Sequence, residues 1–430
     1  MKEKLNEEFI KKLSEKKKEP AWMLEHRLKA YHNFLKQKEP NFGPDIHINF
    51  DEICYYKDKT NKMTDKWEKV SCNLKNTFDN LGVIKAEEEY LGGVTNQYES
   101  EVFYHKQTIG NGIIFTSTDE ALQKYPELFK KYFNNLVKLD ENKYTALNNA
   151  VWSGGSFIYI PKGVKVDKPL QSYFRIESES LGQFEHTIII VDDGAELSYI
   201  EGCTATAYSK TSLHAGVVEI YVGKNAKCRY STIQNWSTDV YNLVTKRAIV
   251  DDGGLMEWVD GNIGSGLTMK YPSCILKGTG ARGNSISVAY AKKGQVLDAG
   301  AKMIHLGQNT KSSIISKSIA QAGGIANYRG TTRITKEATD SVATIKCDTI
   351  LLDDISKSDT FPKNIVGNKT SSLTHEATVS KLDADKLFYL TSKGLSEDQA
   401  RELLIMGFMI DFKKELPMEY AIELNRLIKE

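Results

Sequence analysis

The residues best suited to chemistry are Cys347 and the adjacent pair His375 and Glu376, which begins 28 positions later. A thiolate, an imidazole and a carboxylate together suit a transition-metal ion or an iron–sulfur cluster. Both segments, TIKCDTILLDD and SLTHEATVSKLD, have the β-branched composition of strands. Neighbouring side chains of a strand point to opposite faces, so only one of His375 and Glu376 can face a given site unless the strand bulges or ends there.

The other cysteines carry a weaker signal. The chain has six cysteines and no CxxC pair, which argues against a structural zinc site and against a disulfide scaffold. Most cysteines in proteins are buried packing residues, and we adopt this interpretation for Cys54, Cys72, Cys228 and Cys274. Reduced thiols are typical of the cytoplasm, which is therefore the predicted compartment.

The composition excludes several classes of protein. With 40% hydrophobic and 26% charged residues, it is typical of a soluble globular protein. A net charge of +1 over 430 residues gives no indication of nucleic acid as the main partner. The charged N-terminus lacks the apolar segment of a secretory signal, and no long apolar run predicts a membrane span.

The common sequence signatures of cofactor-binding proteins and hydrolases are either absent or lie in a segment with the wrong predicted secondary structure. GTGARG, residues 278–283, fits the GxGxxG pattern, but a strand-like segment follows it where a dinucleotide site needs a helix. No P-loop pattern occurs, so we do not expect the chain to bind ATP through one. Neither GxSxG nor HExxH occurs, which removes the commonest hydrolase signatures.

The N-terminal region, residues 1–147, is predicted to be an α-rich domain with some β structure. One helix is expected at AWMLEHRLKAYHNFLKQ, and a second over residues 116–137, with Ser117 or Thr118 as its cap. The apolar residues at helical spacing in the first helix are Trp22, Leu24, Leu28, Tyr31 and Leu35.

The middle region, residues 148–382, consists of short strand-like runs such as SFIYI, EHTIIIV and GVVEIYV. Turns such as DDGA (192–195) and DDGG (251–254) recur every thirty to forty residues. This pattern is typical of a sandwich, a barrel or a β-solenoid, and its length favours the solenoid. Residues one coil apart stack in a solenoid, so Cys347 and the His375–Glu376 pair are expected to converge.

The C-terminal region, residues 383–430, returns to a helical period. Ser396 and Gln399 fit a capping box, and Pro417 stands at the start of a last predicted helix. The helix that follows the capping box is more apolar than a solvated helix needs, so it either packs on the chain's own core or docks a partner. Its apolar residues are Leu403, Leu404, Met406, Phe408, Met409 and Ile410.

Long segments of the chain match a known pattern. They are NAVWSGGSFIYIPKGVKVDKPLQSYFRI, GQFEHTIIIVDDGAELSYIEGCTA, IQNWS, YNLVTKRA, KYPSCILKG and HEATVSKL. These segments closely resemble the SufB/SufD family of the SUF machinery for iron–sulfur cluster assembly. The resemblance extends from EPAWMLEHRLKAY to ELPMEYAIELNRLI and so covers nearly the whole chain. Cys347 with HEAT, EGCTA and IQNW favour the SufB members, which are scaffolds, over the paralogous SufD members.

The resemblance implies a fold and a set of partners. The middle region is expected to be a right-handed parallel β-helix, between an N-terminal α/β domain and a C-terminal helical domain. The C-terminal helix is expected to dock a SufC-type ABC ATPase through Leu403, Leu404, Met406 and Phe408. ATP would then be handled by that partner, and this chain would be an assembly scaffold rather than an enzyme. The further partners implied are a sulfur donor protein and either SufD or a second copy of this chain.

The resemblance also implies the assembly site. Cys347 matches the cysteine on which the family assembles a nascent cluster, and His375 and Glu376 match its helpers. One cysteine cannot hold a cluster alone, so the remaining ligands are expected from a partner across an interface. A transient cluster, of the [4Fe–4S] type, is the expected cargo, and a flavin as electron source is left open.

A sulfur path is implied as well. Cys203, in EGCTA, matches the proposed acceptor of persulfide sulfur and is therefore expected to be exposed and partly thiolate. Glu177 departs from the family pattern, which has an asparagine there, so the path is not lined identically. The arginine and lysine of the path have an alternative role in satisfying buried strands. The residues that match the path are Arg175, Gln234, Trp236 and Lys246.

Two alternatives come from other classes of protein. One is a structural, SufD-like partner of the ATPase that carries no cluster; such a chain would not need Cys347. The other is a carbohydrate-active enzyme, because β-helices often host polysaccharide lyases and hydrolases. The absence of a secretory signal argues against the second alternative.

Overall fold

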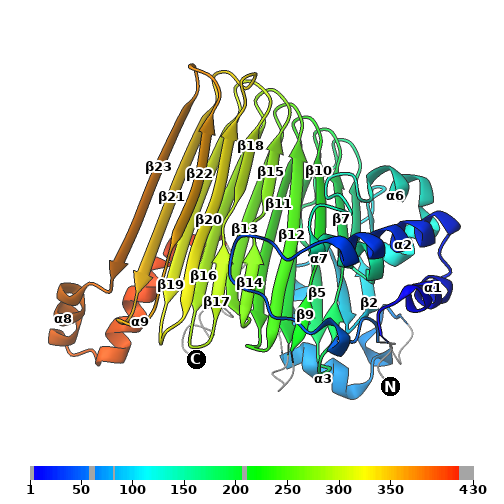
Figure 1. Ribbon diagram of the computed structural model, residues 1–430, viewed down its shortest axis with the longest axis horizontal. Coiled ribbons are helices and arrows are strands. Elements are labelled where there is room, and N and C mark those ends of the chain that lie inside the picture. The colour runs from blue at the N-terminus through cyan, green and yellow to red at the C-terminus, as the bar shows by residue number, and fades with distance from the viewer. Residues whose placement is uncertain (1–3, 58–62, 81–82, 206–210, 416–430) are drawn as a thin grey trace.

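Short strands joined by tight turns coil into a β-solenoid of about eight turns (Figure 1). The computed structural model describes residues 4–57, 63–80, 83–205 and 211–415. The turns predicted at 192–195 and 251–254 hold Gly194 and Gly253 at positive φ, a conformation that strains other residues. The predicted class, mainly β with a β-helix core and helical ends, is confirmed.

One wall of the solenoid is a ten-stranded sheet whose strands are parallel except for one antiparallel strand at the N-terminal edge. In spatial order its strands are β2 (Glu101–Gln107), β1 (Gly93–Tyr98), β5 (Leu170–Ile176), β8 (Glu196–Ala205), β11 (Lys227–Trp236), β13 (Leu255–Gly264), β16 (Arg282–Ala291), β19 (Lys311–Ala320), β21 (Val342–Leu351) and β23 (Ser372–Lys381).

The opposite wall is a sheet of mostly shorter strands, also parallel except for β3 (Ile114–Ser117), which runs antiparallel to β4 (Ser156–Ile160). Its other strands are β6 (Gly182–Gln183), β7 (His186–Val191), β9 (Ser212–His214), β10 (Val217–Val222), β12 (Val240–Val250), β14 (Leu267–Lys270), β15 (Ser273–Leu276), β17 (Val296–Ala299), β18 (Lys302–His305), β20 (Ile325–Ile334) and β22 (Thr360–Val366).

Paired residues of successive turns form rows that run along the solenoid axis. From β5 to β23 on the first wall, the separation between partners ranges from 27 residues, for Met256 and Gly283, to 31, for Leu197 and Cys228. The predicted interval of thirty to forty residues is therefore too long. Inward-facing side chains such as Ile189, from the second wall, and Trp258, from the first, build the apolar core between the walls.

Helices cover the N-terminal end of the solenoid (Figure 1). They are α1 (Glu7–Lys16), α2 (Ala21–Lys36), α3 (Cys72–Asn80), α4 (Val83–Glu89), α5 (Thr118–Lys124), α6 (Pro126–Tyr132) and α7 (Lys143–Val151), with the 3-10 turns η1 (Phe50–Glu52) and η2 (Trp67–Lys69).

The buried face of α2 differs from the predicted one. The five predicted residues are partly buried or, like Leu35 with 60% exposure, exposed. Arg27 lies on the buried face, where it pairs with Glu19 (Nη2–Oε1 2.6 Å) and donates to the carbonyl oxygen of Trp152. Hydropathy does not predict a buried arginine, which explains the error. The fully buried residues are Met23, Arg27, Ala30 and Phe34.

The predicted helix over 116–137 is two helices. Pro126 occupies the first position of α6, and Tyr125 separates α6 from α5. Proline favours the first turn of a helix because its missing N–H is not needed there. Ser117 caps α5 as predicted, since its side chain accepts from the Glu120 backbone N–H.

Three helices follow the solenoid: α8 (Ala384–Ser392), α9 (Glu397–Phe408) and α10 (Ile410–Glu415). The predicted capping box of Ser396 and Gln399 opens α9. Ile405, Met409 and Phe412 are buried against apolar residues of the first wall's outer face. The helix predicted from Pro417 lies outside the described residues. In the described part of the chain, no helix is both long and apolar enough to cross a membrane.

Among the described residues, no helices cover the last strands at the C-terminal end of the solenoid. β23 pairs only with β21, and β22 pairs only with β20, so each has one unpaired edge in the described part of the chain (Figure 1). Both strands are largely exposed. Their exposed apolar residues are Phe361, Ile365, Val366 and Val379.

Candidate functional site

Cys347 and His375 meet at this open end. The Nε2 atom of His375, on β23, lies 3.5 Å from the Cys347 Sγ atom, on β21. Cys347 pairs in register with Ala377, thirty residues later, while His375 pairs with Ile345 on the same inward face. The predicted convergence of Cys347 and His375 is therefore present, as a diagonal contact between neighbouring strands.

Glu376 lies on the other face of β23. It pairs in register with Lys346, and both side chains are exposed. The register between β21 and β23 is continuous, so no bulge turns Glu376 towards Cys347. Of the adjacent pair, only His375 faces the cysteine in this conformation.

Two further residues complete the surroundings of the pair. The Asn364 side-chain nitrogen lies 3.0 Å from His375 Nδ1, and the ring of Tyr328 lies 6.4 Å from the His375 ring. The buried hydroxyl of Tyr328 has no nitrogen or oxygen partner among the described residues, and the Cys347 thiol is the polar group beside it. Both residues come from the opposite wall, and no motif marked them in the sequence.

The Cys347–His375 pair is neutral in the isolated chain. Cys347 is 4% exposed, and burial raises the pKa of its thiol to about 12, against a smaller lowering by the Tyr328 hydroxyl. Burial also lowers the pKa of His375. A neutral thiol is a poor nucleophile and a poor ligand, so the site needs an opening motion or a bound cation to become reactive.

The site does not supply a full set of metal ligands. Among the residues that the structure describes, no group of three or more His, Cys, Asp and Glu side chains is arranged to hold a metal ion. Cys347 and His375 provide two donors, and a structural metal site normally has four.

Cys203 is not exposed as predicted. Its side chain is fully buried in β8, with the Sγ atom 3.8 Å from a carboxylate oxygen of Glu201. Burial, with Glu201 as a second cause, raises the pKa of the Cys203 thiol well above its ordinary value. The prediction of an exposed, partly thiolate cysteine is wrong for this conformation, because position 203 faces the interior.

A row of buried polar residues links the strand of Cys203 to Cys347. Each member pairs in register with the next, over five strand steps that span roughly 24 Å. Thr232 Oγ1 donates to Asp260 (2.7 Å), and Ser287 Oγ donates to Ser316 Oγ (3.2 Å). We call this set the polar row: Glu201, Thr232, Asp260, Ser287, Ser316 and Cys347.

Two buried lysines balance the acids of the polar row. Lys246 Nζ lies 3.3 Å from Glu201 Oε1, and Lys270 Nζ lies 3.0 Å from Asp260 Oδ1. Burial acts to lower the pKa of Lys246, but Glu201 and Asp260 outweigh it and raise that pKa. Burial lowers the pKa of Lys270 in spite of Asp260. Of these four residues, only Lys246 was predicted from the sequence; Glu201, Asp260 and Lys270 were not.

Three of the four predicted path residues face the interior. Gln234 accepts from Lys270 Nζ (3.1 Å), the ring of Trp236 lies 4.7 Å from that of His214, and Lys246 is described above. Arg175 instead faces the outside of the first wall, where it pairs with Glu177 and donates to Thr204 (3.1 Å). Some buried atoms of the interior have no protein partner among the described residues: Gln234 Nε2, Trp236 Nε1, Asp260 Oδ2 and Asn262 Oδ1.

The predicted docking residues differ in exposure. Leu403 is 52% exposed, Leu404 is half-buried, and Met406 and Phe408 pack against the chain's own core. On α8, Phe388 is 75% exposed, and Tyr389 is also exposed; neither residue was predicted from the sequence.

The remaining cysteines divide into two groups. Cys228 and Cys274 are buried packing residues, as predicted. Cys54 is only partly buried and Cys72 is exposed, so the packing interpretation is wrong for Cys72.

Known proteins match this chain over both the solenoid and the N-terminal region that packs on it. Residues 174–408 match the family model described as SUF system FeS cluster assembly, SufBD core domain, and residues 4–172 match the SufBD protein N-terminal region. The chain is 54% identical over 429 residues to an iron–sulfur cluster assembly SufBD family protein of Staphylococcus saprophyticus. It is 55% identical to proteins of the same description from Staphylococcus haemolyticus and Staphylococcus aureus. Each alignment covers 99% of this chain and 92% of the relative.

Proposed function

Because the chain belongs to the SufBD family of iron–sulfur cluster assembly proteins, we propose that it is a SufB-type scaffold on which a nascent cluster is built. Cys347 is the proposed assembly residue and His375 the second ligand. Glu376 would join them only after the end strand rearranges. The cluster, of the proposed [4Fe–4S] type, is cargo that the protein releases. The carbohydrate-active alternative is dropped, because the family is one of cluster assembly.

The observation that carries this proposal is the contact between Cys347 and His375 at the open end of the solenoid. Thiolate is the usual ligand of iron–sulfur clusters, whereas imidazole is the less common one. A protein that keeps its cluster supplies a full ligand set, but a scaffold must release its product. Two donors from this chain, completed by donors from a partner, meet that requirement.

Sulfur is proposed to enter at Cys203. The Cys203 thiol is buried in the isolated chain, with a raised pKa, so docking of the donor is proposed to expose it. The Cys203 thiolate then attacks the outer sulfur of the donor persulfide, a new S–S bond forms, and the donor thiolate leaves, without net oxidation or reduction. The polar row contains no cysteine between Glu201 and Cys347, so sulfur must cross it as a small anion. Two electrons and one proton convert the Cys203 persulfide to the thiol and HS⁻; a reduced flavin is the proposed reductant.

The interior offers positive charge to such an anion. Lys246 and Lys270 are buried beside the polar row, and the orphaned donors Gln234 Nε2 and Trp236 Nε1 lie on the same interior surface. A buried anion needs either a cation or hydrogen-bond donors, and the first half of the row has both within reach.

Two surfaces are proposed to bind partners. A SufC-type ATPase would dock on α8 and α9 through Phe388, Tyr389 and Leu403, which are exposed and apolar. SufD or a second copy of this chain would pair with the free edges of β22 and β23 and supply the missing ligands. The cytoplasm, where thiols stay reduced, is the proposed compartment.

A conformational step is needed because Cys347 is buried and neutral. ATP binding by the partner is proposed to shift α8 and α9, which follow β23 directly, and so to open the last turn of the solenoid. ATP binding would thereby favour the open state of the last turn, in which Cys347 is a thiolate.

The test is anaerobic reconstitution with iron and sulfide of the chain co-expressed with its ATPase. We expect Cys347→Ala to lose the cluster in Mössbauer and absorbance spectra. Cys228→Ala, which removes a buried cysteine of the same interior, serves as the control and should retain it. Equal cluster content in wild type and Cys347→Ala would overturn the assignment.

A second candidate function is a structural, SufD-like subunit. The observation in its favour is that both Cys203 and Cys347 are buried and have raised thiol pKa values. In that case neither Cys203→Ala nor Cys347→Ala should change the cluster yield of the complex.

A further inference from the structure

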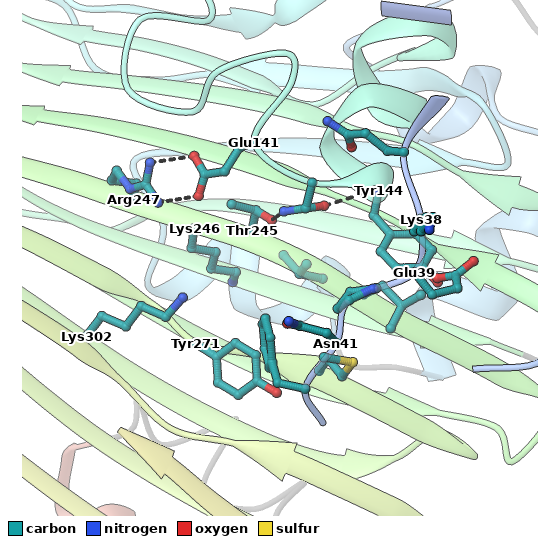
Figure 2. Close-up of a pocket in the computed structure, with 17 residues that line it drawn as sticks. Lys38, Glu39, Asn41, Glu141, Tyr144, Thr245, Lys246, Arg247, Tyr271 and Lys302 are labelled. Carbon is teal, nitrogen blue, oxygen red and sulfur yellow. Dashed lines mark hydrogen bonds and ion pairs between the residues drawn. The ribbon is translucent and has the colours of Figure 1, made fainter. Parts of the chain in front are cut away.

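A cavity outside the solenoid interior has the size of a small-molecule site. It has a volume of about 580 Å³, within the range of about 300–1,000 Å³ typical of ligand pockets. It lies between the segment that follows α2, the start of α7 and the outer face of β12 (Figure 2). None of the site residues at Cys347 lines it.

The charges of the cavity leave an excess of cations. Glu141 accepts two hydrogen bonds from Arg247, one of them 2.6 Å long, and Glu39 pairs with Lys143 (2.7 Å). Both lining acids are therefore already neutralised. The Lys302 ammonium makes no hydrogen bond and no ion pair within the described ranges of the chain.

Arg247 and Lys302 stand in one row. Arg247 pairs with Ser273, and Ser273 pairs with Lys302, so the two cations flank a small residue on one face of the sheet. Burial, with Arg247 as the second cause, lowers the pKa of Lys302. Figure 2 shows Arg247 joined to Glu141 and, on the same wall, Lys302 beside Tyr271. An anion beside Lys302 would offset both the cost of burying its ammonium group and the repulsion from Arg247, whose own charge Glu141 already balances.

The other side chains that line the cavity suit a planar, aromatic ligand. The Lys302 ammonium lies 5.4 Å from the centroid of the Tyr271 ring, and the rings of Tyr271 and Phe42 are 6.1 Å apart. Leu243 and Met269 add apolar surface. Gln37 leaves a buried acceptor, since its Oε1 atom has no partner among the described residues while its Nε2 atom donates to the Asp140 carbonyl oxygen.

We propose that this cavity binds a small planar organic anion, with the anionic group beside Lys302 and Arg247, the ring against Tyr271 and Phe42, and a donor group on Gln37. Aromatic monophosphates have this combination of a charge, a flat ring and a hydrogen-bond donor. The site is separate from the proposed assembly site. β12 nevertheless carries both Arg247 and Lys246, which line the cavity, and the Lys246 ammonium also reaches Glu201 inside the solenoid.

Pyridoxal phosphate is a suitable probe, because its aldehyde forms an imine with a nearby lysine and borohydride reduces that imine to a stable amine. The full-length chain would be treated with one equivalent, reduced, and mapped by peptide mass spectrometry. We expect Lys302 to be the main labelled residue. Pyridoxal, which lacks the phosphate, should label it about tenfold less, as expected for the loss of one charged contact.

Two matched variants complete the experiment. Lys302→Met keeps the length of the side chain and should remove the main label, whereas Lys311→Met, at an exposed strand position, should leave it unchanged. Labelling spread evenly over surface lysines would overturn the proposal. So would equal labelling of Lys302 by pyridoxal and pyridoxal phosphate, which would mean that Lys302 is a reactive amine without an anion site.

Discussion

The side-chain amide of Asn364 lies 3.0 Å from Nδ1 of His375, while the other ring nitrogen of His375 lies 3.5 Å from the sulfur of Cys347. A partner at one nitrogen decides which nitrogen carries the proton of a neutral imidazole. If the amide N–H donates to Nδ1, the Nε2–H faces the thiol. If the amide turns and its oxygen accepts from Nδ1–H, Nε2 presents a lone pair to a metal ion.

Asn364→Asp should therefore strengthen metal binding at Cys347 and His375. A carboxylate can only accept, so it holds the proton on Nδ1 and leaves Nε2 free as a ligand. We expect Co²⁺ affinity, measured from the thiolate-to-cobalt absorption band, to rise about tenfold, as is typical for a hydrogen bond that orients a metal-binding histidine. Thr374→Asp adds the same charge on the opposite face of β23 and is the control. A similar gain in Co²⁺ affinity in both variants would show that the added negative charge alone causes it.

Cys347 should react slowly with iodoacetamide in the isolated chain. Only the thiolate reacts, and because burial raises the pKa to about 12, the reactive form accumulates only as the pH approaches that value. At pH 8 we expect alkylation of Cys347 to be at least about 100-fold slower than that of the exposed Cys72, followed by peptide mass spectrometry. Adding the ATPase partner and ATP should accelerate Cys347 alone. Equal rates for the two cysteines in the isolated chain would contradict the buried, neutral thiol.

Lys246→Met should destabilise the fold. It leaves Glu201 buried without its cation, a change that costs about 3–5 kcal/mol in the free energy of unfolding. Adding Glu201→Gln should recover part of the loss, which urea unfolding measures. Lys227→Met breaks an ion pair of the same 3.3 Å length with Glu196 on the surface and should cost less than about 1 kcal/mol. Similar losses in the two lysine variants would argue that burial does not matter at Lys246.

Ser316→Ala should slow the passage of sulfur along the polar row. Ser316 stands between Ser287 and Cys347, and its hydroxyl accepts from Ser287. Losing one hydrogen bond of about 1 kcal/mol corresponds to a rate about fivefold lower. The measurement is cluster formation from a Cys203 persulfide loaded beforehand to the same level. Ser313→Ala, on the outward face of β19, should behave as wild type; an unchanged rate in Ser316→Ala would exclude this row as the route.

Val379→Asp should weaken association at the open end. Val379 is exposed on β23, and a charge on an edge strand opposes pairing with another chain. We expect a monomer by light scattering where wild type forms a dimer or a complex with SufD, with an unchanged circular dichroism spectrum. Leu35→Asp places the same charge on an exposed apolar residue of α2, far from the open end, and should not change the mass. Association that persists in Val379→Asp would place the interface elsewhere.

The sequence predicted the solenoid well because turn residues and β-branched runs are local signals. DDGA and DDGG fixed the turns, and the alternation of His375 and Glu376 correctly indicated that one of them faces away. The contact between Cys347 and His375 was predicted from spacing, although the true register partner of Cys347 is Ala377. Pro126 was a local signal for the break between α5 and α6 that the helical pattern obscured.

The features that the sequence did not predict depend on contacts between distant parts of the folded chain. Asn364 and Tyr328 reach the site from the opposite sheet, and only the folded coil brings them to His375. Arg27 and Glu19 became buried as a pair, which neither residue type signals alone. The burial of Cys203 followed from the phase of β8 relative to the interior, a property that a match to EGCTA does not contain.

The two ends of the solenoid limit the symmetry of any assembly it forms. At the N-terminal end, antiparallel β2 and β3 and the helices interrupt the parallel ladders, whereas the C-terminal end offers two free parallel edges. Stacking of an open end on a closed end would add chains without limit and produce a filament. Among the described residues, however, the edge strands of the closed end, β2 and β3, run antiparallel to their neighbours and so do not continue the parallel ladders. Two open ends can still pair about a two-fold axis. Their edge strands then run antiparallel to each other, and the free edges of both chains become paired. In such a pair growth would stop at two chains, and the Cys347 of each chain would lie one strand in from the shared edge.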